Sequence, residues 1–461
     1  MKKLNNLKWF TLGITLTVLV AAFIIPVLAS VRKVQVMLNY NDIKITFDGT
    51  AIVPRDENGT IVEPFIIDGT AYLPVRGIAD ALGLDVSWDG NTSTVILTTT
   101  EQSNNQHDII KALFEQDFPE KEKINKILAD FYNEHLLPGG ISMAISYKGK
   151  LVYANSVGYA DKDHKVPLTP EYRMRIASVS KPITSIAIMK LIEENKIHLD
   201  DIVFGETGIL GTEYGMPVYK NNFAEITVKN LLEHTSGGWG NSKNDPMFMI
   251  TDKDGKALIQ EVLKKYPLSK LPGTERDYSN FGYYILGRVI EEISGETYEN
   301  YVKTNILTPC GISGMRIGGD TSSHDEVEYF PSLDGRNPYH LKPFHMDAHG
   351  GWIANPIELL KILVRVDALS DSEQLLKPET IKTMTAPSIR NENYALGWCV
   401  NKSNNWWHMG GMPGTSAMMA RSSRGFNWAI LVNSIVPISD IDKLFWEMYL
   451  AVQNWPEGIE L

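Results

Sequence analysis

The chain has 461 residues, of which 43% are hydrophobic and 21% are charged, so it can form two or three globular domains with substantial cores. Its formal net charge is −11, and an acidic surface repels phosphate backbones, which argues against a nucleic-acid-binding protein. Solubility is the simplest interpretation of this acidity.

The N-terminus has the pattern of an export signal. Lysines near the start precede the uncharged run from Trp9 to Leu28, and Val27 and Ala29 supply the small residues of a cleavage site. The run also reaches the ~20 residues that a membrane helix needs. Residues 1–30 are therefore predicted to be a signal peptide or a membrane anchor. Either places the rest of the chain outside the cell or in its envelope, with membrane contact only through this segment.

Residues 31–100 are predicted to form a small β-rich domain. Val34–Leu38 and Ile43–Phe47 alternate apolar and polar residues, and Asp-Gly pairs mark turns. The stretch YLPVRGIADALGLDVSWD, residues 72–89, predicts a strand, a short helix and another strand. It resembles the copper amine oxidase-like N-terminal domain that forms a stalk on exported bacterial proteins. Since residues 31–100 contain no His or Cys, the ligands that Cu²⁺ favours are missing, and we expect a spacer or a cell-wall contact without a cofactor.

Residues 101–120 are polar, as is typical of a linker, and a larger domain is predicted over residues 121–461. Its first elements are a helix over Lys123–His135 and a hairpin of Ile141–Tyr147 and Leu151–Tyr153.

The end of the chain returns to strands. Ala395–Val400, Ala417–Ala420 and Trp428–Val432 have strand patterns, and an amphipathic helix follows over Asp440–Gln453. Between the two ends, the sequence Asn355-Pro-Ile-Glu358 predicts a capped helix start. This order predicts an α/β (α+β) domain in which both termini contribute to one antiparallel sheet, flanked by helices and joined to an all-helical region.

Ser178-Val-Ser-Lys181 is the first motif that carries chemistry. Residues three apart share a helix face, so Lys181 would lie one turn beyond Ser178. Burial lowers the proton affinity of a lysine, which lets it act as the base that a serine nucleophile requires. A helix N-cap is the alternative role for Ser178. The pattern alone is weak, because Ser30-Val-Arg-Lys33 matches it as well.

Tyr278-Ser-Asn280 is the second motif. A phenol beside a lysine can pass a proton to a leaving group, and an Asn amide can bind both a lysine and a substrate carbonyl. Other tyrosines also precede an Asn by two residues, but Tyr278 lies in a predicted loop just before an apolar helix.

His408-Met-Gly-Gly411 is the third motif. Gly410 and Gly411 would let a strand approach a substrate closely, and a backbone N–H of this strand could help Ser178 to bind an oxyanion. A glycine-rich loop between strands is the alternative.

The three motifs in this order resemble the serine β-lactamase and penicillin-binding-protein family, closest to its class C branch and the related esterases and D-amino-acid peptidases. The phrases LLEHTSGG, HGGWIANPIELLK and HMGGMPGTSAMMA extend the resemblance over residues 121–461. It implies that Ser178 is acylated, that Lys181 is its base and that Tyr278 is the partner acid or base. It also implies that Asn280, His408, Gly410 and Gly411 contact the substrate, the last through an oxyanion N–H.

The chain departs from this family in the third motif. β-Lactamases and D-Ala-D-Ala peptidases usually have a lysine and a hydroxyl residue there, which help to bind a substrate carboxylate. His408 is at most a weak cation and Met409 has no hydroxyl, so the sequence argues against efficient β-lactamase activity.

Two further groups of residues could have other roles. His345 and His349 have a spacing that could bind a metal on a helix, with His340 nearby, but helix signals begin only at Asn355, so no metal site is predicted. Cys310 and Cys399 could form a disulfide or remain free thiols.

The sequence thus predicts an exported serine hydrolase that acts on a small ester, amide or peptide through an acyl-enzyme at Ser178. A penicillin-binding D-Ala-D-Ala carboxypeptidase or a weak β-lactamase is the alternative within this class. A non-catalytic cell-wall-binding protein is the alternative of another class.

Overall fold

The computed structural model describes residues 43, 45–47, 50–52, 54, 61–67, 70–81, 84–89, 94–99, 118–214, 222–241, 245–253, 255–319, 322–323, 325–332 and 335–461. The predicted signal or anchor and most of the predicted linker lie outside these residues. None of the helices in the described part of the chain combines the length and apolar character that a membrane span requires. The chain forms two compact units, Met1–Thr99 and Thr100–Leu461, each of which is described by itself.

In its described residues, the first unit has three antiparallel strand pairs and one helix. The pairs are β1 (Ile45–Phe47) with β2 (Thr50–Ile52), β3 (Phe65–Ile67) with β4 (Thr70–Tyr72), and β5 (Leu84–Asp89) with β6 (Thr94–Thr99), and the helix is α2 (Val75–Ala81). The predicted strand, helix and strand over residues 72–89 are confirmed. The predicted strand over residues 34–38 and both Asp-Gly turns lie outside the described residues.

A seven-stranded antiparallel sheet is the centre of the second unit, and it joins both ends of that unit. In spatial order its strands are β12 (Cys399–Val400), β13 (Trp406–Met412), β14 (Thr415–Arg421), β15 (Phe426–Val432), β7 (Gly140–Tyr147), β8 (Lys150–Gly158) and β16 (Ile459–Glu460). β7 pairs with β15 along its whole length. The predicted fold class is therefore confirmed.

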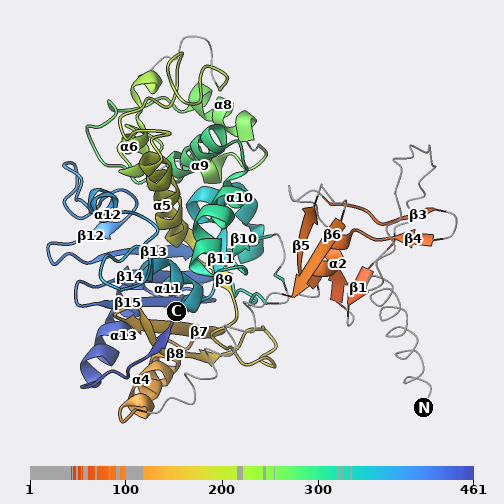
Figure 1. Ribbon diagram of the computed structural model, residues 1–461, viewed down its shortest axis with the longest axis vertical. Coiled ribbons are helices and arrows are strands. Elements are labelled where there is room, and N and C mark those ends of the chain that lie inside the picture. Colours follow the sequence, from red (N-terminus) through yellow and green to blue (C-terminus); the bar gives the residue numbers. More distant parts are fainter. Residues whose placement is uncertain are drawn as a thin grey trace. The chain divides into compact units, whose positions relative to one another are not determined.

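Helices cover both faces of this sheet. On one face lie α4 (Lys121–Glu134) and α13 (Ile438–Ala451), which are side by side in Figure 1. Their apolar stripes enclose one core, in which the rings of Trp428 and Phe445 stack with centroids 3.7 Å apart. On the other face α11 (Pro356–Val364) packs against β15 and β7, between the sheet and the helical region.

The helical region supplies most of the larger core. Its principal helices are α5 (Ser180–Glu193), α6 (Val228–Leu232), α7 (Pro246–Met249), α8 (Gly255–Lys265), α9 (Asn280–Ser294), α10 (Tyr298–Val302) and α12 (Pro378–Met384). Shorter turns are η1 (Ala177–Val179), η2 (Phe223–Glu225), η3 (Lys303–Leu307), η4 (Thr308–Cys310), η5 (Pro338–His340), η6 (Pro343–Met346) and η7 (Asp347–Gly351). A small antiparallel sheet of β10 (Arg316–Ile317), β11 (Trp352–Ala354) and β9 (Met174–Arg175) leads into η1 and α5.

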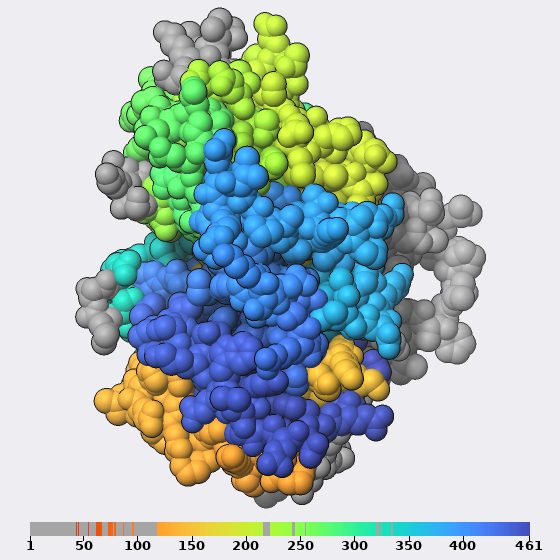
Figure 2. Space-filling model, turned by 90° about the vertical axis from the view of Figure 1, so that its left-hand side faces the viewer, coloured from red at the N-terminus to blue at the C-terminus, as the bar shows by residue number. Residues whose placement is uncertain are grey.

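One face of the second unit shows how the C-terminal strands bridge its two parts. In Figure 2 the C-terminal residues, in blue, extend from the region of the first strands, in orange, up to the helical region, in green. Strands from the end of the chain therefore lie beside helices from its middle, which brings distant motifs together.

Two local predictions need correction. The strand predicted over Ala395–Val400 is confined to Cys399–Val400, because Gly397 has a φ of +84° and the Ala395 N–H donates to Trp398 O in a turn. The second strand of the first hairpin continues to Gly158, well beyond the predicted Tyr153. Cys310 and Cys399 are both free thiols.

Asn355 caps α11 as its sequence predicts. Its side-chain oxygen accepts the Glu358 N–H at 2.9 Å, and the Glu358 carboxylate accepts the Asn355 N–H at 2.9 Å. Both residues are buried, and Glu358 also binds the guanidinium of Arg173, the residue before β9, which ties the helix start to that strand. The cap thereby holds α11 between the sheet and the helical region.

We predict that Asn355→Ala lowers the free energy of unfolding by about 1–2 kcal/mol, because a buried N–H at the helix start loses its acceptor. Asn355→Ser, whose hydroxyl can accept the same N–H, should cost less. Denaturant unfolding of both variants measures the difference. Equal stabilities for the two variants would contradict the capping role.

Candidate active site

The nucleophile segment is a turn at the start of a buried helix. Ile176 N donates to Trp352 O at 3.0 Å, which anchors the segment to β11. Ala177 then has a φ of +48°, a left-handed conformation that is strained for a residue with a β-carbon. Ser178 is the partly exposed residue of η1, whereas α5 is buried on nearly all sides. The turn therefore presents the Ser178 hydroxyl to solvent at the edge of a rigid core.

Lys181 lies completely buried one turn beyond Ser178. Its Nζ donates to Ser178 Oγ at 3.2 Å, to Asn280 Oδ1 at 2.7 Å and to His349 O at 2.9 Å. Burial lowers the pKa of Lys181 to about 7, against an opposing effect of the Asp245 carboxylate. In the neutral form of the amine its two N–H groups suffice for Asn280 Oδ1 and His349 O, so the lone pair can accept the Ser178 proton.

Asn280 is held by a second amide contact. It is the first residue of α9, which Ser279 caps, and its Nδ2 donates to Asp245 Oδ2 at 2.7 Å. Because the NH₂ group faces Asp245, the carbonyl oxygen must face Lys181. Asp245 in turn caps α7 through the Met247 N–H at 3.0 Å.

Tyr278 lies in the loop before α9, with its ring centroid 4.8 Å from Lys181 Nζ. Burial raises the pKa of its phenol, and a hydrogen bond to Ser178 only partly opposes that effect. The phenol therefore stays protonated near neutral pH and can donate a proton, while Lys181 is the group that can accept one.

His234, Tyr394 and His408 form a hydrogen-bonded chain of uncharged side chains next to Tyr278. His234 packs on the Tyr278 ring, with centroids 4.2 Å apart, and its Nδ1 accepts the Ser279 N–H at 3.1 Å. Its Nε2 must then donate to the Tyr394 hydroxyl at 3.0 Å. Tyr394 also lies 3.2 Å from His408 Nε2.

The environment of His408 fixes that ring as a neutral group. Its Nδ1 lies 2.8 Å from Met409 O and can only donate to it, so Nε2 accepts from Tyr394. Burial, reinforced by the charge of Lys181, lowers the pKa of His408 to about 3. His408 therefore supplies no positive charge to a substrate at neutral pH.

β13 runs directly behind the nucleophile turn. A β-carbon at Gly410 would lie 2.2 Å from Ile176 O and 3.1 Å from Ser178 N, so only glycine allows this approach. A β-carbon at Gly411 would meet nothing within 4 Å. The two adjacent glycines thus differ: Gly410 packs against the nucleophile turn, and Gly411 borders open space.

The structure brings all seven sequence-predicted site residues into one region and adds others. Asp245 and Tyr394 were not singled out from the sequence, although Asp245 precedes Pro246 in the pattern of a helix cap. His234, which lies in the phrase LLEHTSGG, contacts Tyr278 directly. Nothing in the sequence near Tyr394 indicates its contact with two histidines.

The histidines of the 340–349 segment are arranged differently from our expectation. Helical turns η6 and η7 occur there before Asn355, because Gly351 lacks the β-carbon that would lie 2.3 Å from Pro343 O. His349 is buried beside Lys181, and burial lowers its pKa. Within the described ranges, no group of three or more His, Cys, Asp or Glu side chains is placed to hold a metal ion.

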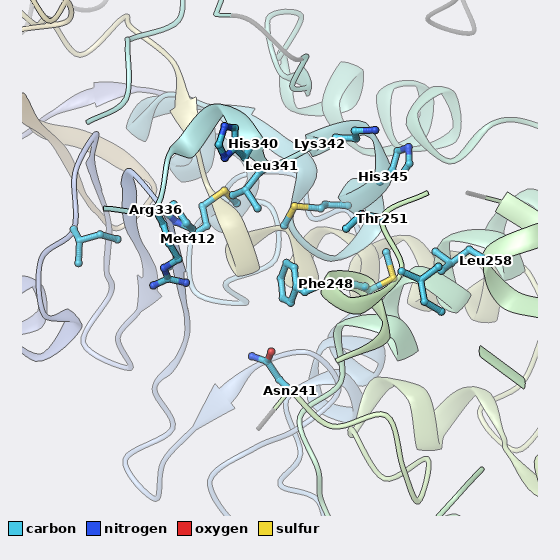
Figure 3. A pocket seen from close by; sticks show the side chains of 16 residues that line it. Asn241, Phe248, Thr251, Leu258, Arg336, His340, Leu341, Lys342, His345 and Met412 are labelled. Atoms are coloured by element: carbon cyan, nitrogen blue, oxygen red, sulfur yellow. The ribbon is translucent and has the colours of Figure 1, made fainter. Parts of the chain in front are cut away.

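A cavity of about 580 Å³ lies beside this site. Its lining includes Gly411 and Met412 at the end of β13 and Met247 and Phe248 of α7. Figure 3 shows His340, Leu341 and Lys342 along one wall and Phe248 on the opposite one. The volume is typical of a small-molecule site.

Fold and site together define a β-lactamase-type serine hydrolase architecture, and comparisons with known proteins agree. Residues 125–453 match the Beta-lactamase family, and residues 27–97 and 57–109 match the Copper amine oxidase N-terminal domain. The chain therefore belongs to the Beta-lactamase family, a family of serine hydrolases with this fold.

The relatives are distant. Protein flp of Staphylococcus aureus (strain N315) is 25% identical over 354 residues, which cover 72% of this chain and 67% of that protein. Penicillin-binding protein 4* of Bacillus subtilis (strain 168) is 26% identical over 303 residues, or 59% of this chain and 63% of that protein.

Solved structures share the fold. The octameric penicillin-binding protein homologue from Pyrococcus abyssi has a TM-score of 0.60 and 26% identity, and the match covers 73% of this chain and 80% of that one. The D-amino acid amidase from Ochrobactrum anthropi SV3 also has a TM-score of 0.60, with 21% identity over 72% of this chain and 99% of that one. At that identity the amidase supports the fold alone.

We predict that Gly410→Ala lowers the free energy of unfolding by about 1–3 kcal/mol, because a new methyl group would overlap the backbone before Ser178. Gly411→Ala is the matched control, and it should change stability by less than about 0.5 kcal/mol. Denaturant unfolding of both variants provides the measurement. Equal effects at the two glycines would contradict the close approach of β13.

Proposed function

We propose that the protein is an exported serine hydrolase that cleaves a small ester, amide or peptide through an acyl-enzyme on Ser178. The observation that carries this proposal is the contact between Lys181 Nζ and Ser178 Oγ at 3.2 Å, made by a buried amine whose pKa is about 7. A serine hydroxyl becomes an effective nucleophile when such a base takes its proton.

In the first half of the reaction, Ser178 Oγ attacks the substrate carbonyl carbon while its proton passes to Lys181. The carbonyl oxygen becomes an oxyanion, and we assign its stabilisation to the N–H groups of Ser178 and Gly411. When the intermediate collapses, the bond to the leaving group breaks and the Tyr278 phenol protonates that group. The Lys181 ammonium returns a proton to Tyr278.

In the second half, water replaces the leaving group. A water proton passes to the Tyr278 and Lys181 pair as the oxygen attacks the acyl carbon, and Ser178 Oγ leaves with a proton from the same pair. Asn280 binds Lys181 and Asp245 through its amide. We assign contact with the acyl group to the second N–H of that amide.

A penicillin-binding D-Ala-D-Ala carboxypeptidase is the second candidate, and similarity to the Bacillus subtilis penicillin-binding protein favours it. The neutral state of His408 argues against it, because the strand motif then lacks a cation for the substrate carboxylate. A fluorescent penicillin distinguishes the two: a stable adduct on Ser178 supports the carboxypeptidase, and rapid ester turnover without an adduct supports the esterase or amidase.

The export proposal rests on the basic and then apolar pattern of residues 1–30. Residues 31–100 would then separate the hydrolase from the cell surface or contact wall polymer. The match to the Copper amine oxidase N-terminal domain supports a separate module at this position.

We predict that Ser178→Ala reduces hydrolysis of a chromogenic short-chain ester to background, because the attacking oxygen is lost. Ser180→Ala is the matched control, since Ser180 is in the same helix turn but contacts the Trp352 N–H and not Lys181. It should retain most of the activity. Equal rates for Ser178→Ala and the parent protein, with both folded by circular dichroism, would reject the assignment.

We predict that kcat/KM rises with pH through an apparent pKa near 7 and then levels off. The neutral amine of Lys181 is the reactive form, and it predominates only above that pKa. The raised pKa of Tyr278 keeps the phenol protonated across this range. A profile that is flat between about pH 5 and 9 would contradict the role of Lys181 as base.

A further inference from the structure

The cavity beside Gly411 combines an apolar lining with positive charge. Methionine, leucine and phenylalanine side chains form much of its wall, among them Met247, Phe248 and Leu341. Arg336 and Lys342 are its charged residues, and none of the sixteen lining residues is acidic. This local excess of positive charge contrasts with the net charge of −11 for the whole chain.

Contacts at two points join this cavity to the nucleophile. Ala177, the neighbour of Ser178, packs in a small apolar cluster with Met346 and Met412, which both line the cavity. Across the cavity, Asn241 lines its wall and donates its N–H to Tyr278 O at 2.6 Å. The cavity therefore adjoins both the nucleophile turn and the loop that carries Tyr278.

The oriented amide of Asn280 forms a third link. The Asp245 carboxylate accepts a hydrogen bond from Asn280 Nδ2, and Asp245 is also the N-cap of α7. Met247 and Phe248 of that helix line the cavity. The helix whose start orients Asn280 is thus also part of the cavity wall.

The motif His408–Gly411 on β13 does not supply the positive charge that an anionic substrate would need. His408 is neutral, with both ring nitrogens in hydrogen bonds, and Met409 has no polar side-chain group that could replace it. Arg336 and Lys342 are both exposed. Lys342 forms no ion pair with a carboxylate in the described part of the chain.

We propose that the cavity binds one arm of the substrate, and that this arm is apolar along its length and ends in a carboxylate. The proposal rests on the proposed function and specifies its substrate class. The apolar part packs against the methionine-rich wall, which adapts to different chain lengths. The carboxylate reaches Lys342 or Arg336, whose side chains are exposed at the cavity wall.

Two matched pairs of esters test the proposal on the full chain. In the first pair, nitrophenyl hexanoate is compared with the nitrophenyl monoester of adipate, so the acyl arm ends in a methyl group or a carboxylate. In the second pair, hexyl acetate is compared with its analogue that ends in a carboxylate, so the difference lies in the leaving group. Together the pairs cover both sides of the scissile bond.

We expect the anionic member of at least one pair to have a kcat/KM about five-fold higher at low ionic strength, the effect of one partly exposed ion pair. High salt should remove the preference, because mobile ions screen exposed charges. The ratio should fall in Arg336→Gln or Lys342→Gln. Lys126→Gln, which removes an exposed cation on α4, is the matched control and should leave the ratio unchanged.

The outcomes separate the two proposals. Hydrolysis that depends on Ser178 but shows no preference for the anionic member of either pair would overturn the substrate assignment and leave the proposed function intact. A preference that persists in both cavity variants would also overturn it. Hydrolysis that persists in Ser178→Ala would overturn the proposed function and this inference together.

Discussion

Burial of the Lys181 amine is the physical constraint on which the site depends. A lysine removed from water loses much of its affinity for a proton, and its pKa falls to about 7. The unfolded chain binds that proton more strongly between about pH 7 and 10, so burial destabilises the folded state most below pH 7 and less as the pH rises. The fold must offset this cost, and the burial of α5 in the larger core indicates how: the helix is fixed on nearly all sides by packing. The folded protein thus loses some stability because Lys181 is buried, and the same burial makes the amine reactive, as is common at active sites.

The neutral hydrogen-bonded chain of His234, Tyr394 and His408 follows from the same constraint. A cation near Lys181 would lower the pKa of the amine further, and a nearby anion would raise it. Burial and fixed hydrogen-bond partners keep the His234 and His408 rings neutral, so their charge neither lowers nor raises the pKa of Lys181. The His234 ring also packs against the ring of Tyr278. Charge recognition must then come from outside the strand motif. The cavity with Arg336 and Lys342 meets this requirement at a distance from the buried amine.

Much of this architecture could be predicted from the sequence, because its signals are local or periodic. The short apolar runs of β14 and β15, the amphipathic pattern of α13 and the cap at Asn355 each indicate their structure within a few residues. Only a family resemblance predicted that the three motifs meet, because no local sequence pattern indicates how close they lie in the folded chain. Asp245 and Tyr394 were missed for this reason: each acts through a partner far away in the sequence, Asn280 for the first and His234 for the second. The error over Ala395–Val400 came from Gly397, whose left-handed conformation converts an apparently regular strand into a turn.

The pKa of Lys181 itself is the most direct test of this account. Selective ¹³C labelling of the lysine ε-carbons, followed by an NMR titration of the full chain, reports each ammonium group separately, and Lys181→Arg identifies the signal of interest. We predict one lysine signal with a midpoint near pH 7 that is missing from the variant, well below the usual lysine value of about 10.4. If every lysine signal titrates near that usual value, Lys181 is a protonated structural residue at neutral pH and cannot be the base for Ser178.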